Sequence, residues 1–434
     1  MIKSIEMSMT INKNTQAYAK EMDEKDPLKS YRERFFIPQH NGNDSIYFTG
    51  NSLGLQPKSV KDYIQQELDD WAEFGVEGHF DAKKPWFAYH EFLTPKIAKI
   101  VGAKDSEVVV THSLTTNLHL LMVSFYRPTK QRFKILCEKK AFPSDQYALE
   151  SQIKFHGFTT DEALIEVGPR EGEHLIRHED ILSAIDEAGE ELAMVMIGGV
   201  NYYSGQLFDM ESITKKGHEV GATVGFDLAH AAGNVILKLH DWGVDFAAWC
   251  SYKYLNSSPG GVSGMFVHER HEFNPELPRF AGWWGYDKET RFQMEPGFVP
   301  MKGAEGWQLS NAPVLGMAAH LASLDIFDEV GMEQLRAKSD QLTAYLEEII
   351  HDISARLGHL CEFEIITPKN QKERGAQLSI LAHGKGKAMF DALTEEGVIA
   401  DWREPNVIRI APVPMYNSFE DIYRFGQALE KAIQ

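Results

Sequence analysis

The middle of the chain alternates short apolar runs with amphipathic stretches, and this alternation constrains the fold more than any other feature. Helical patterns fall between most of the apolar runs, which is the arrangement of parallel strands joined by crossover helices. The sequence therefore predicts an α/β fold with a mostly parallel, seven-stranded sheet. The seven predicted strands are 107–112, 133–138, 163–168, 191–200, 222–227, 245–250 and 261–268.

Past residue 312 the pattern changes to that of a smaller α+β unit. Two long helical stretches, 313–329 and 331–354, precede the strand-like segments EFEIIT, AQLSILAH, GVIADWR and NVIRIAP, with helices near 386–396 and 418–432. A chain of 434 residues also exceeds one typical hydrophobic core. We predict an N-terminal arm (1–45), a large α/β domain (46–312) and a small C-terminal α+β domain (313–434) that the N-terminal segment completes.

The composition is that of an acidic globular protein. The formal net charge of −19 argues against nucleic acid or an anionic membrane as the main partner. The first residues, MIKSIEMSMTINKN, lack the pattern of a secretory signal, and no apolar stretch is long enough to cross a bilayer. Cys137, Cys250 and Cys361 form neither a disulfide framework nor a zinc spacing. We expect a cytoplasmic protein with a small-molecule substrate and with neither nucleic acid nor membrane as a partner.

Two charged residues follow apolar runs at the centre of the predicted sheet. Asp227 ends the run GATVGFD, and Lys253 comes soon after DFAAWC. Because the carboxyl ends of parallel strands meet at one edge, both side chains are expected in one crevice. A lysine amine condenses with the aldehyde of pyridoxal phosphate, and a carboxylate keeps its pyridine nitrogen protonated. The pair predicts this cofactor, although a strand-end cap and a solvated lysine would fit each residue taken alone.

A helix start after the first predicted strand is a candidate phosphate site. The segment HSLTTNLHLLMVSF opens with Ser113, Leu114 and Thr115 and continues as an apolar helix. Free N–H groups and the positive end of the helix dipole suit a phosphate there. A simple Ser/Thr helix cap would explain the same residues.

Three further candidates lie near the predicted strand ends. Phe142, in AFPSDQYALE, fits either a ring stacked on the pyridine or a core residue. His230 fits a cofactor contact or the cap of a turn. Tyr252, directly before the lysine, fits a phosphate ligand, a proton donor or a half-buried aromatic residue.

The segment HERHEF (268–273) has the composition of a metal-binding tract. It lacks the HExxH spacing and lies at a strand end. We interpret it as a solvated charge cluster, and no metal site is predicted in this chain.

Together these stretches resemble the kynureninase family of fold-type I pyridoxal phosphate enzymes. The matching segments are, in order, YFTGNSLGLQP, GHFDAKKPW, SLTTNLHLLM, AFPSDQYALESQ, NYYSGQ, DLAHAAGN, SYKYLNSSPGG, AGWWGYD, QLSNAP and IRIAPVPMYNSFED. Each motif is weak alone, but their common order is specific. The resemblance implies a homodimer with shared active sites that hydrolyses L-kynurenine or 3-hydroxy-L-kynurenine to anthranilate or 3-hydroxyanthranilate plus L-alanine. It also implies a place in tryptophan catabolism and pyridine nucleotide synthesis.

The resemblance also implies roles for individual residues. Lys253 would carry the cofactor, Asp227 would hold the pyridine nitrogen, and Tyr252 would relay a proton. Arg409 matches the arginine that binds the substrate α-carboxylate. The implied phosphate-side contacts are Leu114, Thr115, Tyr252, Trp283 and Asn311, and the implied ring contacts are Phe142, Pro143, Ser144, Asp145 and His230. Trp283 and Asn311 would reach a site across the dimer interface.

Substrate choice and one departure also follow from the resemblance. His79 and Asn311 match the type that favours 3-hydroxykynurenine, since both can hydrogen-bond a ring hydroxyl, and Ser52 would lie beside them. We therefore predict a preference for the hydroxylated substrate. Gly198 departs from the pattern, because relatives can carry a serine there, and only a backbone contact remains at this position.

Three other functions fit parts of the sequence, one of them an aminotransferase, which would lack a use for His79 and the Trp283-Trp284 pair. A cysteine desulfurase needs a mobile nucleophilic cysteine, whereas Cys361 leads straight into a predicted strand. A non-catalytic cofactor-binding protein is not rejected by fold alone, but a complete set of catalytic residues is hard to explain without turnover.

Overall fold

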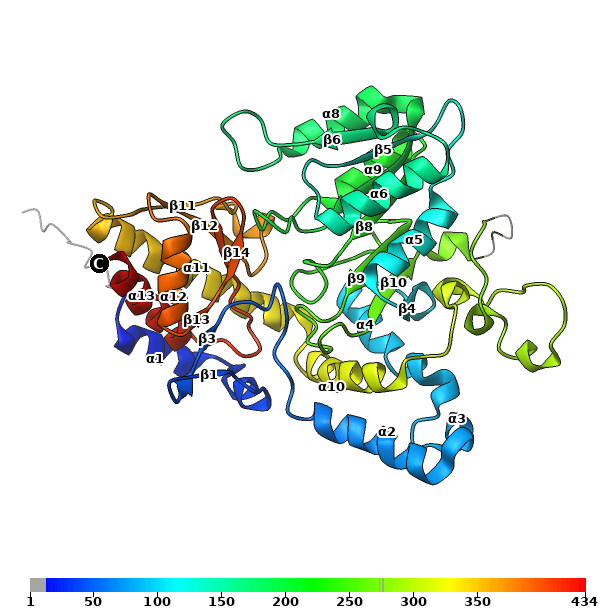
Figure 1. The fold of residues 1–434 in the computed structure, drawn as a ribbon, viewed down its shortest axis with the longest axis horizontal. Helices are drawn as coiled ribbons and strands as arrows, with labels where there is room; N and C mark the ends of the chain where they lie inside the picture. The colour runs from blue at the N-terminus through cyan, green and yellow to red at the C-terminus, as the bar shows by residue number, and fades with distance from the viewer. Residues whose placement is uncertain (1–12, 273, 275–276) are drawn as a thin grey trace, which may run out of the picture.

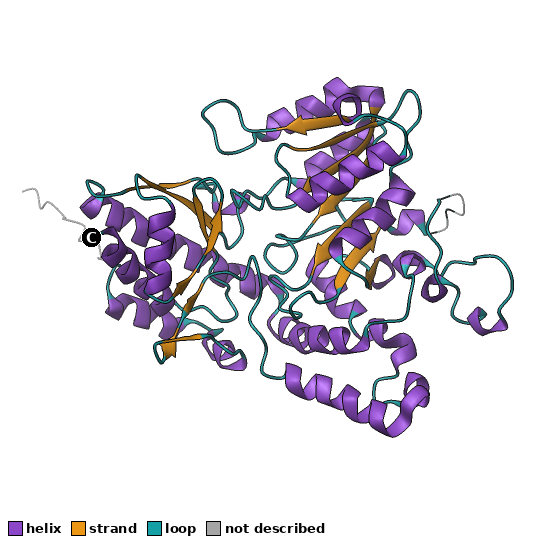
Figure 2. Cartoon of the chain, viewed as in Figure 1, coloured by secondary structure: helices purple, strands orange, loops and turns teal. Residues whose placement is uncertain are grey.

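The structure is a computed structural model that describes residues 13–272, 274 and 277–434. It has a larger part with a sheet covered by helices on both faces and a smaller part with its own sheet and helices (Figures 1 and 2). The two parts lie side by side, with the ends of several strands of the larger sheet facing the smaller part (Figure 1). The chain therefore has the predicted α/β architecture.

All seven predicted strands of the larger sheet are present. They run in the order β4-β10-β9-β8-β7-β5-β6, and β10 alone is antiparallel to its neighbours. The prediction of a mostly parallel, seven-stranded sheet is confirmed. The strands are β4 (Val108–Val110), β5 (Lys134–Glu138), β6 (Leu164–Val167), β7 (Leu192–Gly198), β8 (Thr223–Asp227), β9 (Phe246–Cys250) and β10 (Ser263–Val267).

Alternate residues of these strands enter two different apolar cores. Phe246 and Ala248 of β9 join the core under α5 (Leu114–Phe125), α6 (Pro143–Phe155) and α7 (Thr160–Ala163). Ala247 and Trp249 join the core under α4 (Thr94–Val101), α8 (His178–Ala188), α9 (Met210–Glu219) and α10 (Val314–Val330). Because both faces are covered, the strands are mainly apolar, which is why the sequence marks them so clearly.

Two helices extend the larger part along its lower edge in Figure 1. Helix α2 (Val60–Phe74) begins shortly after Pro57, as the sequence predicts, and Val60 packs against Ala319 and Ala322 of α10. The short α3 (Gly78–Asp81) follows it. None of the helices within the described residues has the length and apolar character needed to cross a membrane.

The smaller part contains a four-stranded antiparallel sheet in the order β11-β12-β15-β14. Its strands and helices lie where the sequence predicts them. The strands are β11 (Glu362–Ile365), β12 (Leu378–His383), β14 (Asp401–Arg403) and β15 (Val407–Ile410), and the helices are α11 (Met332–Leu357), α12 (Lys387–Glu395) and α13 (Phe419–Ile433).

The N-terminal segment packs on the smaller part. The Asp23 carboxylate of α1 (Gln16–Lys25) accepts the N–H groups of Phe419 and Glu420 at the start of α13, at 2.8 and 2.9 Å. Strand β3 (Ile46–Tyr47) pairs in parallel with β13 (Val398–Ile399), and β1 (Gln39–His40) forms a hairpin with β2 (Asn43–Asp44). The boundary between the two large apolar clusters lies within α11, which is later in the chain than residue 312. The predicted domain limits stay a prediction.

A buried carboxylate joins the strands that position the centre of the sheet. Asp245, directly before β9, accepts the N–H of Val224 in β8 at 2.8 Å, and the Nε2 atoms of His218 and His271 each lie 2.8 Å from it. Burial alone would raise the pKa of Asp245, but the hydrogen bonds from the two histidines lower it well below 3.8. This contact fixes β8 against β9 at the amino end of both strands.

Replacing Asp245 should therefore weaken the fold. Asp245→Ala is expected to lower the free energy of unfolding by about 3 kcal/mol, since a buried N–H and two imidazoles lose their acceptor. Asp245→Asn keeps an acceptor for Val224 and should lose less. Because the pKa is lowered, the stabilisation is present above about pH 4 and is lost as the pH falls further. Urea unfolding followed by circular dichroism measures the difference, and equal midpoints for Asp245→Ala and wild type would contradict it.

Candidate active site

A cavity of about 280 Å³ opens at the carboxyl ends of β5, β7 and β8. This edge is where open parallel sheets bind their ligands. Most of the residues that the sequence singles out meet there. The cavity is lined by Ser113, Leu114, Thr115, Glu138, Phe142, Ser144, Asp145, Gly198, Val200, Tyr202, Asp227, Ala229, His230, Tyr252 and Lys253.

The lysine and the histidine of the cavity touch each other. The Nζ atom of buried Lys253 lies 3.0 Å from Nε2 of His230. Burial lowers the pKa of His230 well below its ordinary value, and the charges of Lys253 and Arg409 lower it further, so this imidazole is neutral at pH 7. Its Nδ1 atom is buried and has no partner among the described residues. An unpaired buried atom at a cavity wall indicates a missing ligand.

Two carboxyl groups share a proton opposite the lysine. Asp227, at the end of β8, accepts the N–H of Ala229 at 2.6 Å and is hydrogen-bonded to Asp145 in the first turn of α6. Burial raises the pKa of both groups, and the charge of Asp227 raises that of Asp145 further. The hydrogen bond from Asp145 and the charge of Lys253 favour ionised Asp227. Asp145 is therefore the protonated member, and Asp227 remains an anion available to a protonated ring nitrogen.

The start of α5 opens into the cavity. Ser113 occupies the N-cap position, but its side chain caps no backbone N–H; its Oγ lies 3.0 Å from Oγ1 of Thr116 instead. The first N–H groups of a helix have no partner within the helix. Ser113, Leu114 and Thr115 can therefore present them to a phosphate. This arrangement favours the phosphate interpretation over a simple side-chain cap.

Phe142 forms a wall of the cavity and is not a core residue. Its side chain is 39% exposed, and its ring meets that of Tyr202 edge to face at 5.2 Å. The Nζ atom of Lys253 lies 5.7 Å from its centroid. Phe142 directly precedes α6, and Pro143 begins that helix, which fixes the backbone where the ring enters the cavity.

Tyr252 is half-buried beside the lysine. Burial raises the pKa of its phenol, and the neighbouring Cys250 raises it further, so Tyr252 is a neutral hydroxyl at pH 7. Its carbonyl oxygen accepts the N–H of Gly54 at 2.8 Å, which ties the loop that carries Ser52 to the lysine segment. A neutral phenol at the cavity wall can donate a proton.

Arg409 approaches from the smaller part. It is 1% exposed on β15, donates from Nη1 to the carbonyl oxygen of Tyr202 at 2.7 Å, and pairs through Nη2 with Asp401. Its Nε is buried and has no acceptor among the described residues. Since Tyr202 lines the cavity, the guanidinium lies behind this wall with one donor unused.

Six predicted site residues do not line the cavity within the described chain: Pro143, Arg409, and the four that follow. The Nδ1 atom of His79 lies 3.0 Å from the carbonyl oxygen of Val76. Trp283 is 40% exposed, and Asn311 lies on the surface. Ser52 is partly exposed in the loop tied to the lysine segment. Their roles stay predictions.

The sequence interpretation missed Glu138 and Tyr202. Glu138 is a charged residue that closes an apolar run, the same signal that marks Asp227, and it lines the same cavity. The only sequence signal for Tyr202 as a site residue is its place in the motif NYYSGQ. Both positions follow from the sheet order, which places β5, β7 and β8 side by side.

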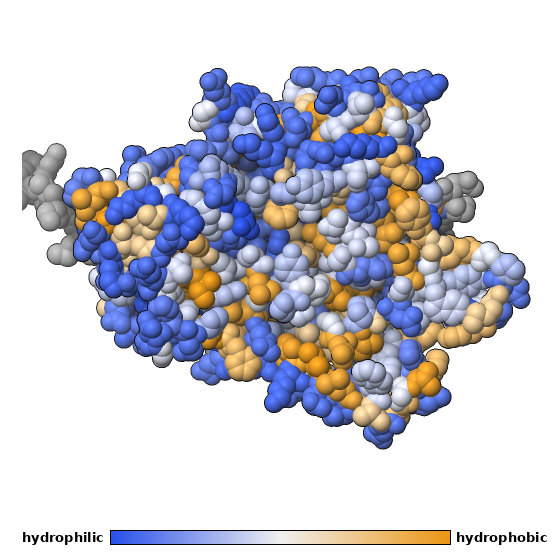
Figure 3. Space-filling model, viewed as in Figure 1, coloured by the Kyte–Doolittle hydropathy of each residue, from blue (hydrophilic) through white to orange (hydrophobic). Residues whose placement is uncertain are grey.

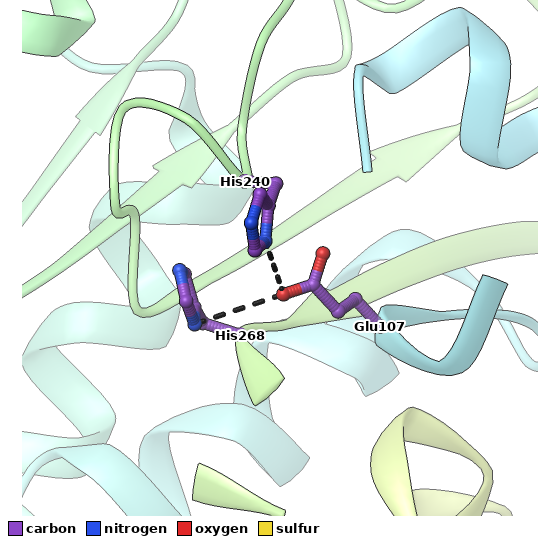
Figure 4. Close-up of side chains that lie close together, drawn as sticks. All are labelled: Glu107, His240 and His268. Carbon is purple, nitrogen blue, oxygen red and sulfur yellow. Dashed lines mark hydrogen bonds and ion pairs between the residues drawn. The ribbon is translucent and has the colours of Figure 1, made fainter. Parts of the chain in front are cut away.

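The interpretation of HERHEF as a solvated cluster is wrong for its two histidines that the structure describes. His268 lies 3.6 Å from buried Glu107, with His240 at 2.9 Å from the same oxygen (Figure 4), and His271 pairs with Asp245. The sequence hid these pairs because their carboxylates are distant in the chain.

This Glu107 cluster has few lone pairs left for a metal ion. The carboxylate already accepts the N–H groups of Glu269 and Lys104, each at 2.9 Å, and Nδ1 of His268 accepts the N–H of Arg270. The two imidazole rings stack rather than converge on one point, with centroids 5.0 Å apart. The geometry therefore supports a structural role.

The cysteines lack the features of a desulfurase. All three are buried, and Cys361 lies directly before β11 with its sulfur against the carbonyl oxygens of Glu362 and His383. A mobile nucleophile needs the opposite environment.

Comparison with known proteins gives the same family as the motifs. The model of the kynureninase C-terminal domain matches residues 335–429. A kynureninase of Flavobacterium psychrophilum is 60% identical over 424 residues, which cover 98% of this chain and 99% of the relative. A kynureninase of Nematostella vectensis is 49% identical and covers 97% of this chain and 94% of the relative.

Solved structures agree on the fold. A cysteine desulfurase from Escherichia coli superposes with a TM-score of 0.74 at 17% identity, over 93% of this chain and 98% of that one. At such low identity the solved structure is evidence for the fold alone. The family follows from the relatives that match nearly the whole chain at 49% and 60% identity. The chain belongs to the kynureninase family.

Proposed function

We propose that this chain uses pyridoxal phosphate to hydrolyse the Cβ–Cγ bond of kynurenine-type amino acids, releasing an anthranilate and L-alanine. The observation that carries the proposal is the convergence of Lys253, Asp227 and the helix start at Leu114 on one cavity. The test is direct: the purified protein should show the absorbance of bound cofactor and should convert 3-hydroxykynurenine into its fluorescent anthranilate. A protein that binds the cofactor but cleaves neither substrate would overturn the proposal.

The residues of the cavity fit this cofactor. When bound, pyridoxal phosphate supplies an electron sink for negative charge developed on the substrate. The Nζ atom of Lys253 would hold the cofactor and then take the proton from the substrate Cα. Asp227 would keep the ring nitrogen protonated, with Asp145 as its proton-donating neighbour, and Phe142 and His230 would bound the ring. The N–H groups of α5 would receive the phosphate.

Arg409 is suited to the substrate α-carboxylate. Its guanidinium is buried behind Tyr202 and keeps an unpaired Nε donor. A planar guanidinium binds a carboxylate with two parallel hydrogen bonds, which fixes the substrate orientation as well as its charge. Asp401, its present partner, would then compete with the substrate carboxylate for the same group.

Tyr252 is the proposed proton donor to Cβ after the Cβ–Cγ bond breaks. Its neutral phenol faces the cavity next to Lys253. Since the alanine product gains a proton at Cβ, the site needs a donor that stays protonated at neutral pH.

Tyr252→Phe should retain cofactor absorbance and lose most turnover, by about 100-fold in kcat, which is a typical contribution of one general acid. Steady-state kinetics and the absorbance spectrum of the same sample measure both effects. An unchanged kcat would remove Tyr252 from the mechanism.

The substrate preference rests on His79 and Asn311. Both side chains can hydrogen-bond a hydroxyl at ring position 3, and a polar site left unpaired by the unhydroxylated ring would penalise it. His79 is held by Val76 and packs against the Trp86 ring at 5.5 Å, so its orientation is constrained.

The kcat/KM for 3-hydroxykynurenine should therefore exceed that for kynurenine. His79→Phe should lower the first value by about tenfold or more and change the second less, because only the hydroxylated ring loses a partner. Parallel kinetics with both substrates decide this, and equal kcat/KM values in the wild type would refute the preference.

A homodimer is proposed from an exposed aromatic surface. The rings of Phe80, Phe87, Phe292 and Trp283 form a chain of contacts with centroids 5.7 to 5.9 Å apart. Phe80 and Phe292 are 56% and 58% exposed, as is usual for side chains that a partner covers. Apolar residues also lie among polar ones along the lower edge of the molecule, where α2 and α3 lie (Figures 1 and 3). This surface would bring Trp283 and Asn311 into the partner's site.

Shared sites predict complementation between inactive variants. Lys253→Ala and Trp283→Ala should each be inactive, yet hybrids would contain one site with both residues intact. Random mixing makes half of the dimers hybrid, so about a quarter of wild-type activity should return. Refolding or subunit exchange followed by the kynurenine assay measures it. No recovery in a mixture shown to contain hybrids would place Trp283 outside a shared site.

The setting of the enzyme is proposed from composition. Three buried, unpaired cysteines suit a reducing compartment, and we propose the cytoplasm. The substrate and products place the reaction in tryptophan catabolism and in the supply of pyridine nucleotide precursors.

A further inference from the structure

The cavity contains one ionisable group that the proposed function does not use, the carboxyl group of Glu138. It is 4% exposed at the end of β5. Its two oxygens lie 3.2 and 3.1 Å from the backbone nitrogen of Gly198, at the end of the next strand, β7. No other hydrogen-bond donor from a different residue of the described chain reaches this carboxyl group.

Gly198 makes room for this contact. A Cβ atom added at position 198 would lie 2.9 Å from Oε1 of Glu138, closer than real Cβ atoms approach. A side chain at position 198 would therefore displace the carboxyl group from its place across the end of β7. On the far side of β7, Gly198 is the register partner of Asp227 in β8.

Glu138 thus belongs to a cluster of three carboxyl groups. Asp227 faces it from β8, and its charge acts on Glu138. The charge of Glu138 in turn acts on Asp145 in α6 and on Tyr202 after β7. The other titratable groups that line the cavity are Lys253, His230 and Tyr252. Burial keeps the imidazole of His230 and the phenol of Tyr252 neutral at pH 7, and the charges of Arg409 and Arg403 act on His230 from the smaller part.

Among the described residues, Lys253 is the one lysine or arginine that lines the cavity beside these three carboxyl groups. A buried carboxylate without a matching cation is costly, so the group with the weakest support keeps its proton. Burial raises the pKa of Glu138 to about 7, and the charge of Asp227 opposes its ionisation further. Asp145 stays protonated and donates to Asp227. Glu138 is therefore the member of the cluster whose charge changes near neutral pH.

We propose that Glu138 is a positioning residue that tunes the cofactor through Asp227. A neutral Glu138 leaves Asp227 as the single anion beside the ring nitrogen, and an ionised Glu138 adds a second negative charge on the same side. The added charge strengthens retention of the proton on the ring nitrogen and weakens the binding of an anionic cofactor. The inference rests on the proposed binding of pyridoxal phosphate next to Asp227.

The test compares Glu138→Gln with wild type. The variant keeps the shape of the side chain and an acceptor for Gly198 but cannot ionise. Glu166→Gln is the matched control: Glu166 is exposed on the adjacent strand β6, pairs in register with Cys137 and does not line the cavity. The measurement is the absorbance of bound cofactor, without substrate, in steps from about pH 6 to about pH 9.

Wild type and Glu166→Gln should show a spectral transition within this pH range, and Glu138→Gln should lack it. The same transition should appear in the pH dependence of the dissociation constant for pyridoxal phosphate added to apoprotein. An unchanged transition in Glu138→Gln, or no transition in wild type, would overturn the inference. A wild type that shows bound cofactor but cleaves no kynurenine would instead overturn the proposed function.

Two further measurements test the inference if Glu138→Gln folds poorly. Gly198→Ala retains Glu138 but displaces its carboxyl group, and it should move the midpoint by about half a pH unit or more. An unmoved midpoint counts against the inference.

The apoprotein gives a readout without cofactor. The pKa of Glu138 is raised from 4.5 to about 7, so its stabilising contribution is present at low pH and is lost as the pH rises through 7. The melting temperature of wild type should therefore fall more between about pH 5 and pH 8 than that of Glu138→Gln. Equal pH dependence in both proteins contradicts the assignment of the titrating group.

Discussion

A carboxylate buried at the end of β8 is the constraint on which the rest of the site depends. Asp227 is 7% exposed, and burial of an anion is costly unless other groups stabilise it. Three elements contribute: the turn after β8 gives the N–H of Ala229, α6 gives the proton of Asp145, and the segment after β9 gives the charge of Lys253. The sheet register, which pairs Gly198 with Asp227 and Asp227 with Ala248, holds these elements at one edge.

The loop after β7 connects this cluster to the smaller part of the molecule. The carbonyl oxygen of Tyr202 accepts from Arg409 at 2.7 Å, and that of Ser204 accepts from the hydroxyl of Thr367 at 2.6 Å. Gln377 donates to Tyr202 as well, at 3.1 Å. The loop that bounds the cavity is therefore held by the smaller part of the molecule, on which Arg409 lies. A shift of the smaller part would therefore move the cavity wall and Arg409 together.

The sequence predicted the elements far better than the contacts between them. The seven strands of the larger sheet were evident because both of their faces are buried, which removes polar residues from the runs. Pairing of β3 with β13 was not evident, since nothing local to Ile46 indicates a partner near Val398. For the same reason HERHEF was misinterpreted: its charges looked solvated because Glu107 and Asp245 lie elsewhere in the chain. The roles of His79 and Trp283 stay predictions, since neither residue lines the cavity of the single chain.

Gly198 illustrates how a departure from a family pattern acquires meaning only in three dimensions. In the sequence, Gly198 only signals that the hydroxyl of a serine is absent at this position. In the structure it is the space into which the Glu138 carboxyl group fits, and the one N–H at that position is shared between both carboxylate oxygens. A serine there would force the carboxyl group to move and would offer it a hydroxyl donor, and each added donor favours the ionised form. With glycine, burial and the nearby charge of Asp227 raise the pKa of Glu138. The backbone N–H groups of Gly198 and of Glu138 itself oppose them only in part, so the proton is retained to higher pH. The residue at position 198 thus controls the charge of a neighbour it does not resemble, and through that neighbour the field at Asp227.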